Sequence, residues 1–283
     1  MKPSLSRSPV LTLLAGLLAL LSACASPNLP KTVALEPPEQ RQALARLMTM
    51  SRQPQPSSVE TGYQLSWQIL GQSGRLEVQL QMDAPDLLRF TALDPLGRTL
   101  YLAVADGRKF ALIDNRAASV QRGLVNGRVW RELVPEPLKV QDVVALLAGR
   151  LERVPAFGVR AEQNPEHNGY WFSWDHPGLS HRVLVDKKTG LMARHLLLEN
   201  EGGKTGILLD LRYIDYDQDR GSGYFWPRTT EVQGSLVKGS LRLARSGPLS
   251  FDPLPLSTFH PDIPPHFKDR KSTRLNSSHP AGS

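Results

Sequence analysis

Apolar and polar residues alternate along much of this 283-residue chain, most regularly over residues 89–114, RFTALDPLGRTLYLAVADGRKFALID. The alternation is broken at 94–97 (DPLG) and at 106–107 (DG). Successive side chains of a β-strand point to opposite faces of a sheet, whereas Asp, Pro and Gly favour tight turns. The stretch therefore predicts three antiparallel strands joined by two hairpin turns. Leu96 is unusual, because it places a bulky aliphatic side chain in one of these turns.

The same alternation continues on both sides of this stretch and predicts a mainly β fold. Candidate strands cover residues 62–70, 74–82, 86–93, 98–105, 108–114, 170–174, 181–186, 192–199, 206–216, 224–232 and 239–245, and 122–130 is a further candidate. The expected total is about ten or eleven strands in one antiparallel sheet. Alternation implies one apolar and one solvated face, and a sheet of this length curls. We therefore expect a curled antiparallel sheet or half-open β-barrel with its apolar face inside.

Two segments change from the period of a strand to the period of a helix. In 36–52 (EPPEQRQALARLMTMSR), two prolines precede apolar residues that recur on one face, among them Ala43, Leu44 and Leu47. In 135–150 (PEPLKVQDVVALLAGR), apolar residues recur at helical spacing and Gly149 is placed to end the helix. We expect two or three α-helices of this kind to cover the opening of the curled sheet.

The N-terminal residues have the features of an export signal. Residues 1–23 carry Lys2 and Arg7, followed by an apolar run that is too short to span a bilayer. The sequence LSAC at 21–24 resembles the lipobox of bacterial lipoproteins, in which the cysteine is acylated, and Cys24 is the one cysteine of the chain. We therefore expect a lipid anchor at Cys24. The alternative is an ordinary secretory signal followed by a coincidental cysteine.

The composition of the chain predicts where its tether, folded domain and tail begin and end. Residues 24–35 are rich in proline and polar residues and are interpreted as a flexible tether. Residues 36–268 are predicted to form a single domain, because no repeat or change of composition divides them. Residues 269–283 (DRKSTRLNSSHPAGS) resemble the translation of a DNA-sequencing adapter and are interpreted as an artefact. A natural disordered tail is the alternative interpretation of this segment.

The charge of the chain is carried in part by these end segments. The whole chain has 34 basic and 27 acidic residues, a formal net charge of +7. Without the two basic residues of the signal and the three basic and one acidic residues of the tail, 29 basic and 26 acidic residues remain, a net charge of +3. The main argument for nucleic-acid binding is thereby lost, and we expect no nucleic-acid partner.

Two polar segments are candidates for metal chemistry, and both fail on spacing. The segment 175–181 (DHPGLSH) brings two histidines and an aspartate close together, but their spacing matches no zinc pattern and is typical of a surface turn. The segment 215–221 (DYDQDRG) resembles the start of a calcium loop. Its sixth position is Arg220 instead of glycine, and its twelfth is Trp226 instead of glutamate. No catalytic motif is present, so we expect neither a metal, nor a cofactor, nor an enzyme.

Large apolar side chains are distributed over many of the predicted strands. Their ordinary role is core packing. A barrel of this strand count can also be too wide for its side chains to fill, which leaves an apolar cavity. The candidates for lining such a cavity are Trp67, Phe90, Leu100, Phe110 and Trp130.

Taken in order, these features resemble the LolA/LolB-like family of periplasmic lipoprotein carriers and outer-membrane receptors, the LolB-like receptors in particular. The resemblance rests on the lipobox at Cys24, a short helix, the segment LDPLGRTLYLAVADGRKFALID, a PL…VVALLAG helix and further hairpins that end near FDPLPL. It covers most of residues 36–256, and its motifs are of medium specificity. This chain is also longer than a typical LolB-like receptor.

The resemblance implies a half-open barrel whose apolar concave face receives acyl chains of lipoproteins or lipids from a soluble periplasmic LolA-like carrier. Leu96 falls at the position of a family leucine that projects from a loop and helps to insert cargo into the membrane. Ala25, directly after Cys24, favours the outer membrane, with the protein facing the periplasm. The implied receptor is a lipid-anchored monomer that binds acylated lipoproteins or lipids without covalent chemistry.

Two other classes of function remain open at this stage. A scaffold lipoprotein that binds protein partners in an envelope complex shares these sequence features and does not need a cavity. Saturable binding of an apolar dye separates the two, because a filled core does not take up dye. A hydrolase or metal enzyme would need His176, His181 or the aspartates of 215–219 at one pocket.

Overall fold

The computed structural model describes residues 29–52, 56–134, 138–151, 154–166, 168–176, 178–201 and 204–269. The chain divides into an N-terminal unit, Met1–Pro30, and a second unit, Lys31–Ser283, to which all the elements below belong. The predicted signal, the predicted anchor Cys24 and most of the predicted tail lie outside the described residues. None of the helices within the described ranges is both long enough and apolar enough to cross a bilayer.

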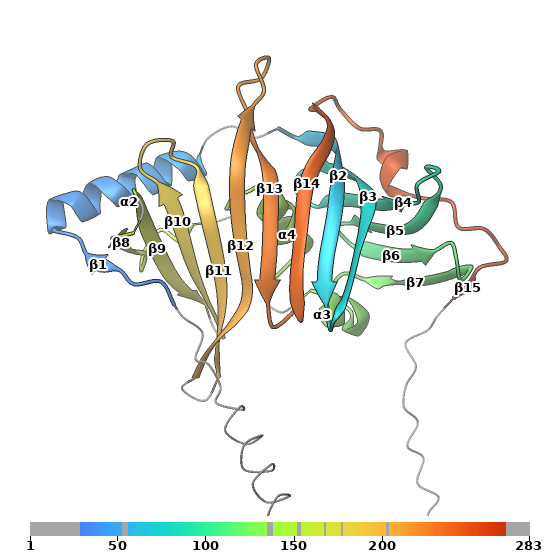
Figure 1. Cartoon of the computed structure of the whole chain (residues 1–283), viewed down its shortest axis with the longest axis horizontal. Coiled ribbons are helices and arrows are strands. Elements are labelled where there is room, and N and C mark those ends of the chain that lie inside the picture. Colours follow the sequence, from blue (N-terminus) through green and yellow to red (C-terminus); the bar gives the residue numbers. More distant parts are fainter. Residues whose placement is uncertain are drawn as a thin grey trace, which may run out of the picture. The chain divides into compact units, whose positions relative to one another are not determined.

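The described part of the chain forms one sheet of fifteen strands (Figure 1). The strands are β1 (Val33–Ala34), β2 (Ser58–Ile69), β3 (Gln72–Asp83), β4 (Leu87–Leu93), β5 (Thr99–Asp106), β6 (Lys109–Asp114), β7 (Ser119–Leu124), β8 (Arg160–Asn164), β9 (Gly169–His176), β10 (Leu179–Asp186), β11 (Met192–Glu201), β12 (Lys204–Gln218), β13 (Phe225–Gly234), β14 (Gly239–Ser250) and β15 (Lys268–Asp269). Their spatial order is β1-β8-β9-β10-β11-β12-β13-β14-β2-β3-β4-β5-β6-β7-β15. All neighbours pair antiparallel except β15, which is parallel to β7. The outermost strands β1 and β15 do not pair with each other, so the curled sheet stays open.

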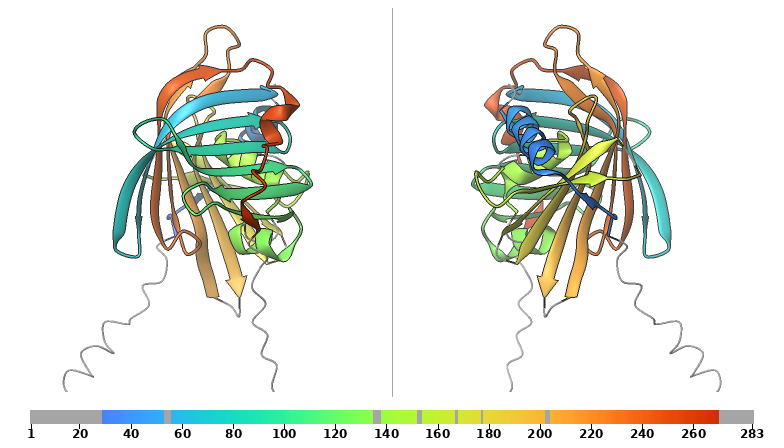
Figure 2. Two further views of the ribbon diagram at one scale, coloured as in Figure 1. Left: turned by 90° about the vertical axis from the view of Figure 1, so that its right-hand side faces the viewer. Right: turned by 90° about the vertical axis from the view of Figure 1, so that its left-hand side faces the viewer.

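Three α-helices lie on the concave side of this sheet (Figure 2). They are α2 (Pro37–Ser51), α3 (Arg128–Leu133) and α4 (Val140–Leu147). Prolines occupy the first turn of α2, where their missing N–H groups cost nothing. At α4, the Asp142 carboxylate accepts the backbone N–H of Lys139 at 2.7 Å, which caps the helix. The 3₁₀ helix η1 (Leu256–Phe259) instead packs Phe259 on Leu102, Val104, Ala111, Ile113 and Val120 of β5–β7.

The concave side holds two clusters of buried side chains. One packs α2, through Ala43 and Leu47, on inward residues of β9–β12 that include Phe172 and Leu197. The other packs α3 and α4 on β2–β6, β13 and β14, and contains Phe110 and Trp130. Helix α4 belongs to both clusters. We call the part of the concave side over β2–β7 and β14, with α3, the filled half, and the part over β9–β13, with the ends of α2 and α4, the hollow half.

The structure confirms the predicted mainly β, curled and unclosed antiparallel sheet, but with more strands than the expected ten or eleven. The strands β1, β8 and β15 were not predicted, because they are short or lack an alternating apolar pattern. The candidate strand 122–130 is confirmed only over 122–124: β7 ends at Leu124, the Gly127 N–H donates to the Leu124 carbonyl at 2.8 Å, and α3 follows. Val33 and Ala34, in the expected tether, pair with Gln163 and Glu162 of β8.

Candidate functional site

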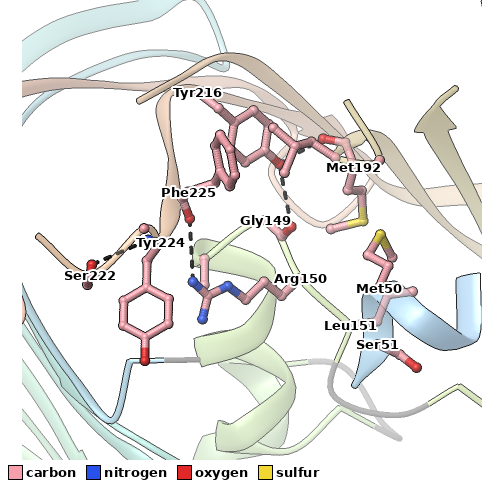
Figure 3. Close-up of a pocket in the computed structure, with 14 residues that line it drawn as sticks. Met50, Ser51, Gly149, Arg150, Leu151, Met192, Tyr216, Ser222, Tyr224 and Phe225 are labelled. Carbon is pink, nitrogen blue, oxygen red and sulfur yellow. Dashed lines mark hydrogen bonds between the residues drawn. The ribbon is translucent and has the colours of Figure 1, made fainter. Parts of the chain in front are cut away.

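Two cavities open in the hollow half, beside the segment that follows α4. They enclose about 340 Å³ and about 370 Å³, within the range of about 300–1,000 Å³ usual for small-molecule sites. The first lies among the end of α2, the β10–β11 turn, Tyr216 and the β12–β13 turn (Figure 3). The second lies between α4 and inward residues of β9–β11. Arg150 and Leu151 line both cavities, so the two share one wall.

Two tyrosines of β12 hold the C-terminal turn of α4 in place. The Tyr213 hydroxyl donates to the Leu146 carbonyl at 2.8 Å, and the Tyr216 hydroxyl lies 2.7 Å from the Met192 carbonyl and 3.4 Å from that of Gly149. Strict alternation would direct these two tyrosines to opposite faces. The left-handed backbone of Asp215, with φ +53°, interrupts the alternation between them. Both hydroxyls therefore reach the helix end, and this fixes the wall of the first cavity.

The walls of the first cavity are mainly apolar and carry one cation. Met50 of α2 and Met192 of β11 face each other with their sulfur atoms, and Arg150 extends toward Tyr224 and Phe225 (Figure 3). The Arg150 guanidinium donates to the Phe225 carbonyl at 3.4 Å and lies 5.8 Å from the ring centre of Trp226. Burial lowers the pKa of Arg150 to about 10, so the side chain remains protonated at neutral pH.

The second cavity is bordered by a histidine pair. The Nδ1 atom of His181 lies 3.1 Å from Nε2 of His195, and the ring of His181 stacks on Trp174 with centres 4.9 Å apart. Burial is the main cause that lowers the pKa of His181 to about 4, and the charge of His176 is the second cause. Burial is likewise the main cause that lowers the pKa of His195 to about 3, and the charge of His181 is the second cause. Both rings are therefore neutral near pH 7 and present polar atoms without charge.

His195 and Arg150 were not among the residues predicted for a site. A signal for His195 was present, because the alternation of 192–199 places it on the same face as Leu197. Its buried Nδ1 has no hydrogen-bond partner within the described ranges. Arg150 had no such signal, since it follows a helix end and its surroundings come from distant strands. The expected surface turn at 175–181 has an exposed His176, but His181 points toward the cavity.

The five residues predicted to line a cavity do not line these two; Phe110 borders an outer groove beside β5–β7, and Trp67 borders a hollow over β2, β3, β13 and β14. Phe110 and Trp130 pack together in the filled half with ring centres 5.5 Å apart, and Phe90 packs against the same cluster. Trp67 lies against Gly74, its partner across the β2–β3 pair. Leu100 is half-buried in β5. None of the five borders either cavity of the hollow half.

Leu96 is 78% exposed, at the tip of the β4–β5 hairpin. The turn is held from within by Asp94, whose carboxylate accepts the backbone N–H groups of Leu96 and Arg98, each at 2.9 Å. The bond from the Arg98 backbone is the main cause that lowers the pKa of Asp94. The leucine side chain is thus directed into solvent and does not fold back onto the sheet.

A second exposed leucine lies at the β2–β3 tip. Leu70 is 78% exposed, and its φ of +50° is the left-handed conformation that two-residue hairpins require. Asn, Asp or Gly is usual there, because a bulky side chain is strained in that conformation. The next hairpin in the sheet, β13–β14, carries Leu236, which is 41% exposed. Pairing of Gly239 with Ile69 places these two tips side by side.

The aspartates of 215–219 do not converge on a common site. Asp217 pairs with Arg228 and Arg245, and Asp219 accepts hydrogen bonds from the backbone and hydroxyl of Ser222. Across the residues that the structure covers, no three His, Cys, Asp or Glu side chains gather as a metal site.

No protein-family model matches this chain, and no curated protein matches it. Among solved structures, a DUF1329 family protein from Desulfovibrio piger has a TM-score of 0.50 at 10% identity, over 75% of this chain and 92% of that one. A LolA superfamily protein from Nitrosomonas europaea has a TM-score of 0.47 at 13% identity, over 77% of this chain and 96% of that one. A domain from Vibrio parahaemolyticus, described as one of an outer membrane lipoprotein-sorting protein, has a TM-score of 0.49 at 12% identity, over 75% and 92%. Likeness at such identities concerns the fold, and this chain shares the fold of the Desulfovibrio protein.

Proposed function

We propose that this protein is a lipoprotein of the outer membrane, anchored through Cys24 and facing the periplasm. It binds acyl chains of lipoproteins or lipids in the cavities of the hollow half and assists their insertion into the outer membrane. A soluble LolA-like carrier delivers the cargo. The observation that carries this proposal is the pair of cavities beneath the ends of α2 and α4, bordered by Met50, Leu151 and Met192.

The physical need for such a cavity follows from the cost of exposing hydrocarbon to water. A lipoprotein carries about three acyl chains, and each buried methylene contributes about 0.8 kcal/mol. Passage through water is therefore slow unless a protein shields the chains. Shielding needs apolar walls and no proton transfer or nucleophile. Direction follows if the receptor holds the chains more tightly than the carrier does and less tightly than the membrane does.

The exposed leucines at two hairpin tips support contact with a membrane. Leu96 and Leu70 are each 78% exposed, and Leu70 is in addition strained. Exposure and strain both cost free energy, and features of this kind are retained at functional sites. A bilayer surface compensates for the exposure by burying both side chains.

The test uses the chain with Cys24→Ser, purified from a bacterial envelope and analysed by mass spectrometry for bound lipid. We expect copurified lipid or acylated lipoprotein, and transfer of a fluorescent acylated peptide to vesicles. Leu96→Asp should leave binding intact and slow the transfer, because only the membrane step is affected. A ligand-free protein that neither binds the acylated peptide nor transfers it contradicts the proposal.

A second candidate function is a scaffold for protein partners. Phe157 favours it, because this aromatic side chain is 90% exposed and such side chains anchor protein interfaces. A scaffold does not need its cavities to be accessible. Saturable uptake of an apolar dye by the purified protein, lost when a cavity is filled, decides for the acyl-binding function. Absence of uptake decides for the scaffold.

A further inference from the structure

Arg150, which follows α4, has fewer compensating partners than several arginines of the sheet. Arg194 is bound to Asp210 through two hydrogen bonds of 2.7 Å, Arg182 lies 3.6 Å from Glu162, and Arg245 pairs with Asp217. In the part of the chain that the structure describes, no carboxylate reaches Arg150. Its one hydrogen-bond acceptor is the Phe225 carbonyl at 3.4 Å. A half-buried cation with this little compensation is costly unless an anion joins it.

The fold holds Arg150 in this position. Gly149 takes the left-handed φ of +66° that ends α4, and a side chain there would collide with the hydroxyl of Tyr216. The backbone N–H of Arg150 donates to the Ala145 carbonyl at 2.9 Å. The guanidinium therefore leaves the helix end in a fixed direction, toward Tyr224 and Phe225 at the first cavity (Figure 3). A pre-oriented guanidinium fork matches a carboxylate or a phosphate through two parallel hydrogen bonds.

The rest of the wall selects among anions. Met50, Leu151, Leu191 and Met192 border the same cavity and offer a ligand mainly apolar contacts. A free inorganic anion gains nothing from these walls, whereas an anion attached to a hydrocarbon chain uses both parts of the site. An acyl ester or amide, as in the lipid of a lipoprotein, has carbonyl oxygens and no charge, so it uses the guanidinium less well.

From this geometry we propose that Arg150 is the headgroup subsite for an anionic amphiphile, whose carboxylate or phosphate binds the guanidinium while its hydrocarbon chain lies against Met50, Leu151 and Met192. The inference rests on the proposed function, because it uses the same cavities, and it narrows the cargo to anionic lipid. Fatty acids and phospholipids are two sources of the same chemistry.

The test compares ligands that differ in charge at one chain length. Oleate, methyl oleate, dioleoyl phosphatidate and inorganic phosphate compete with a fluorescent fatty acid on delipidated Cys24→Ser protein. We expect oleate or phosphatidate to bind about 10- to 100-fold more tightly than methyl oleate, the range for a charge-assisted hydrogen bond. The tighter of the two anions identifies the source. Inorganic phosphate should not compete.

Variants assign this preference to the one side chain. Arg150→Gln should remove the preference for the anion and leave methyl oleate binding unchanged, while Arg150→Lys should keep part of it. Arg242→Gln, on an exposed arginine that pairs with Glu231, is the control and should change neither affinity. Thermal unfolding of each variant verifies folding.

The outcomes separate the two proposals. If neither oleate nor phosphatidate binds more tightly than methyl oleate, the headgroup subsite is overturned and the acyl-binding function is left standing. A preference for the anion that survives in Arg150→Gln also overturns the subsite. Competition by inorganic phosphate at the same concentration as oleate means that the site takes a free anion, which again contradicts an amphiphile. Binding of none of the lipids overturns both proposals.

Discussion

The filled half and the hollow half of the sheet have the same alternating strands and each contains a cluster of buried side chains, yet the two cavities beside α4 both lie in the hollow half. In the filled half, α3 and α4 lay Trp130 and Val144 along the concave face, and Phe110 meets them from β6. In the hollow half, one cavity opens beside Met50 at the end of α2, and the other runs along α4, past Asp142 and Ala145. Alternation thus decides which face is apolar, while the position of the helices decides whether that face is filled.

The largest effect on stability is expected in the filled half. Trp130→Ala removes a side chain that is 8% exposed and packed on Phe110. Such truncations lower the free energy of unfolding by about 3–5 kcal/mol, because hydrophobic contacts are lost and a cavity remains. Urea titration measures the change. The matched variant Met50→Ala, at a cavity wall of the hollow half, should lower the free energy by about 1 kcal/mol. If both variants lowered the free energy of unfolding equally, the two halves would not differ in packing.

The next effect is a pH dependence that belongs to the hollow half. Because the folded-state pKa values of His181 and His195 are about 4 and about 3, below the unfolded value of about 6.5, the unfolded chain binds more protons in acid. The stability contributed by the two neutral rings is fully present above about pH 6.5 and is lost as the pH falls toward 4, by an amount on the order of 3 kcal/mol for each ring. Urea titrations between pH 7.5 and 4.5 measure the loss.

His195→Gln tests the origin of this pH dependence, because it removes the group whose pKa is lowered most, and His266→Gln is the control. The variant should show a flatter profile, and His266→Gln, on an exposed residue outside the hollow half, should keep the steep one. A wild-type profile that is flat between pH 7.5 and 4.5 would mean that the two rings are not held neutral by burial.

A smaller effect is expected from filling a cavity. Leu191→Trp enlarges a half-buried side chain at the wall of the first cavity. We expect the affinity for an apolar fluorescent dye to fall by about tenfold, which is about 1.4 kcal/mol. Leu124→Trp, at an outer groove between β5–β7 and the C-terminal segment, is the matched control. If both variants reduce dye binding equally, the dye does not report on the hollow half.

The smallest expected change is a gain in stability at a hairpin tip. Leu70→Asn replaces a residue strained at φ +50° by one that accepts this conformation. The free energy of unfolding should rise by up to about 1 kcal/mol, while association with lipid vesicles should weaken. Calorimetry and vesicle flotation measure the two quantities. A variant that is less stable, or that binds vesicles as well as the parent, would argue against a membrane role for this tip.

Much of the sheet could be predicted because its signals are local. The three strands expected within 89–114 correspond to β4, β5 and β6, and the turn at 94–97 is formed by hydrogen bonds that the Asp94 carboxylate accepts from residues at most four positions away. Helices α2 and α4 were also predicted, since prolines and apolar spacing mark them. In contrast, β8 (RAEQN) has no alternating apolar pattern, and its pairing with β9 is a property of the folded sheet.

The site could not be predicted in the same way, because its parts come together over long distances in sequence. The predicted cavity residues do not border the two cavities of the hollow half, and Phe110 and Trp130 pack on each other in the filled half. The true walls depend on where α4 ends against β12, a contact between Leu146 and Tyr213 that are 67 positions apart. The exposure of Leu96 could be predicted, because the turn that holds this leucine is visible in the sequence itself.

The missing pairing between β1 and β15 has a mechanical consequence. A closed barrel cannot change its girth without breaking inter-strand hydrogen bonds, since each strand has a partner on both sides. Here the edge strands β1 and β15 are not paired with each other, so they can move apart while the hydrogen bonds between neighbouring strands stay intact. Under the proposed function, binding of acyl chains of different bulk would require elastic bending of the sheet and no loss of hydrogen bonds between strands.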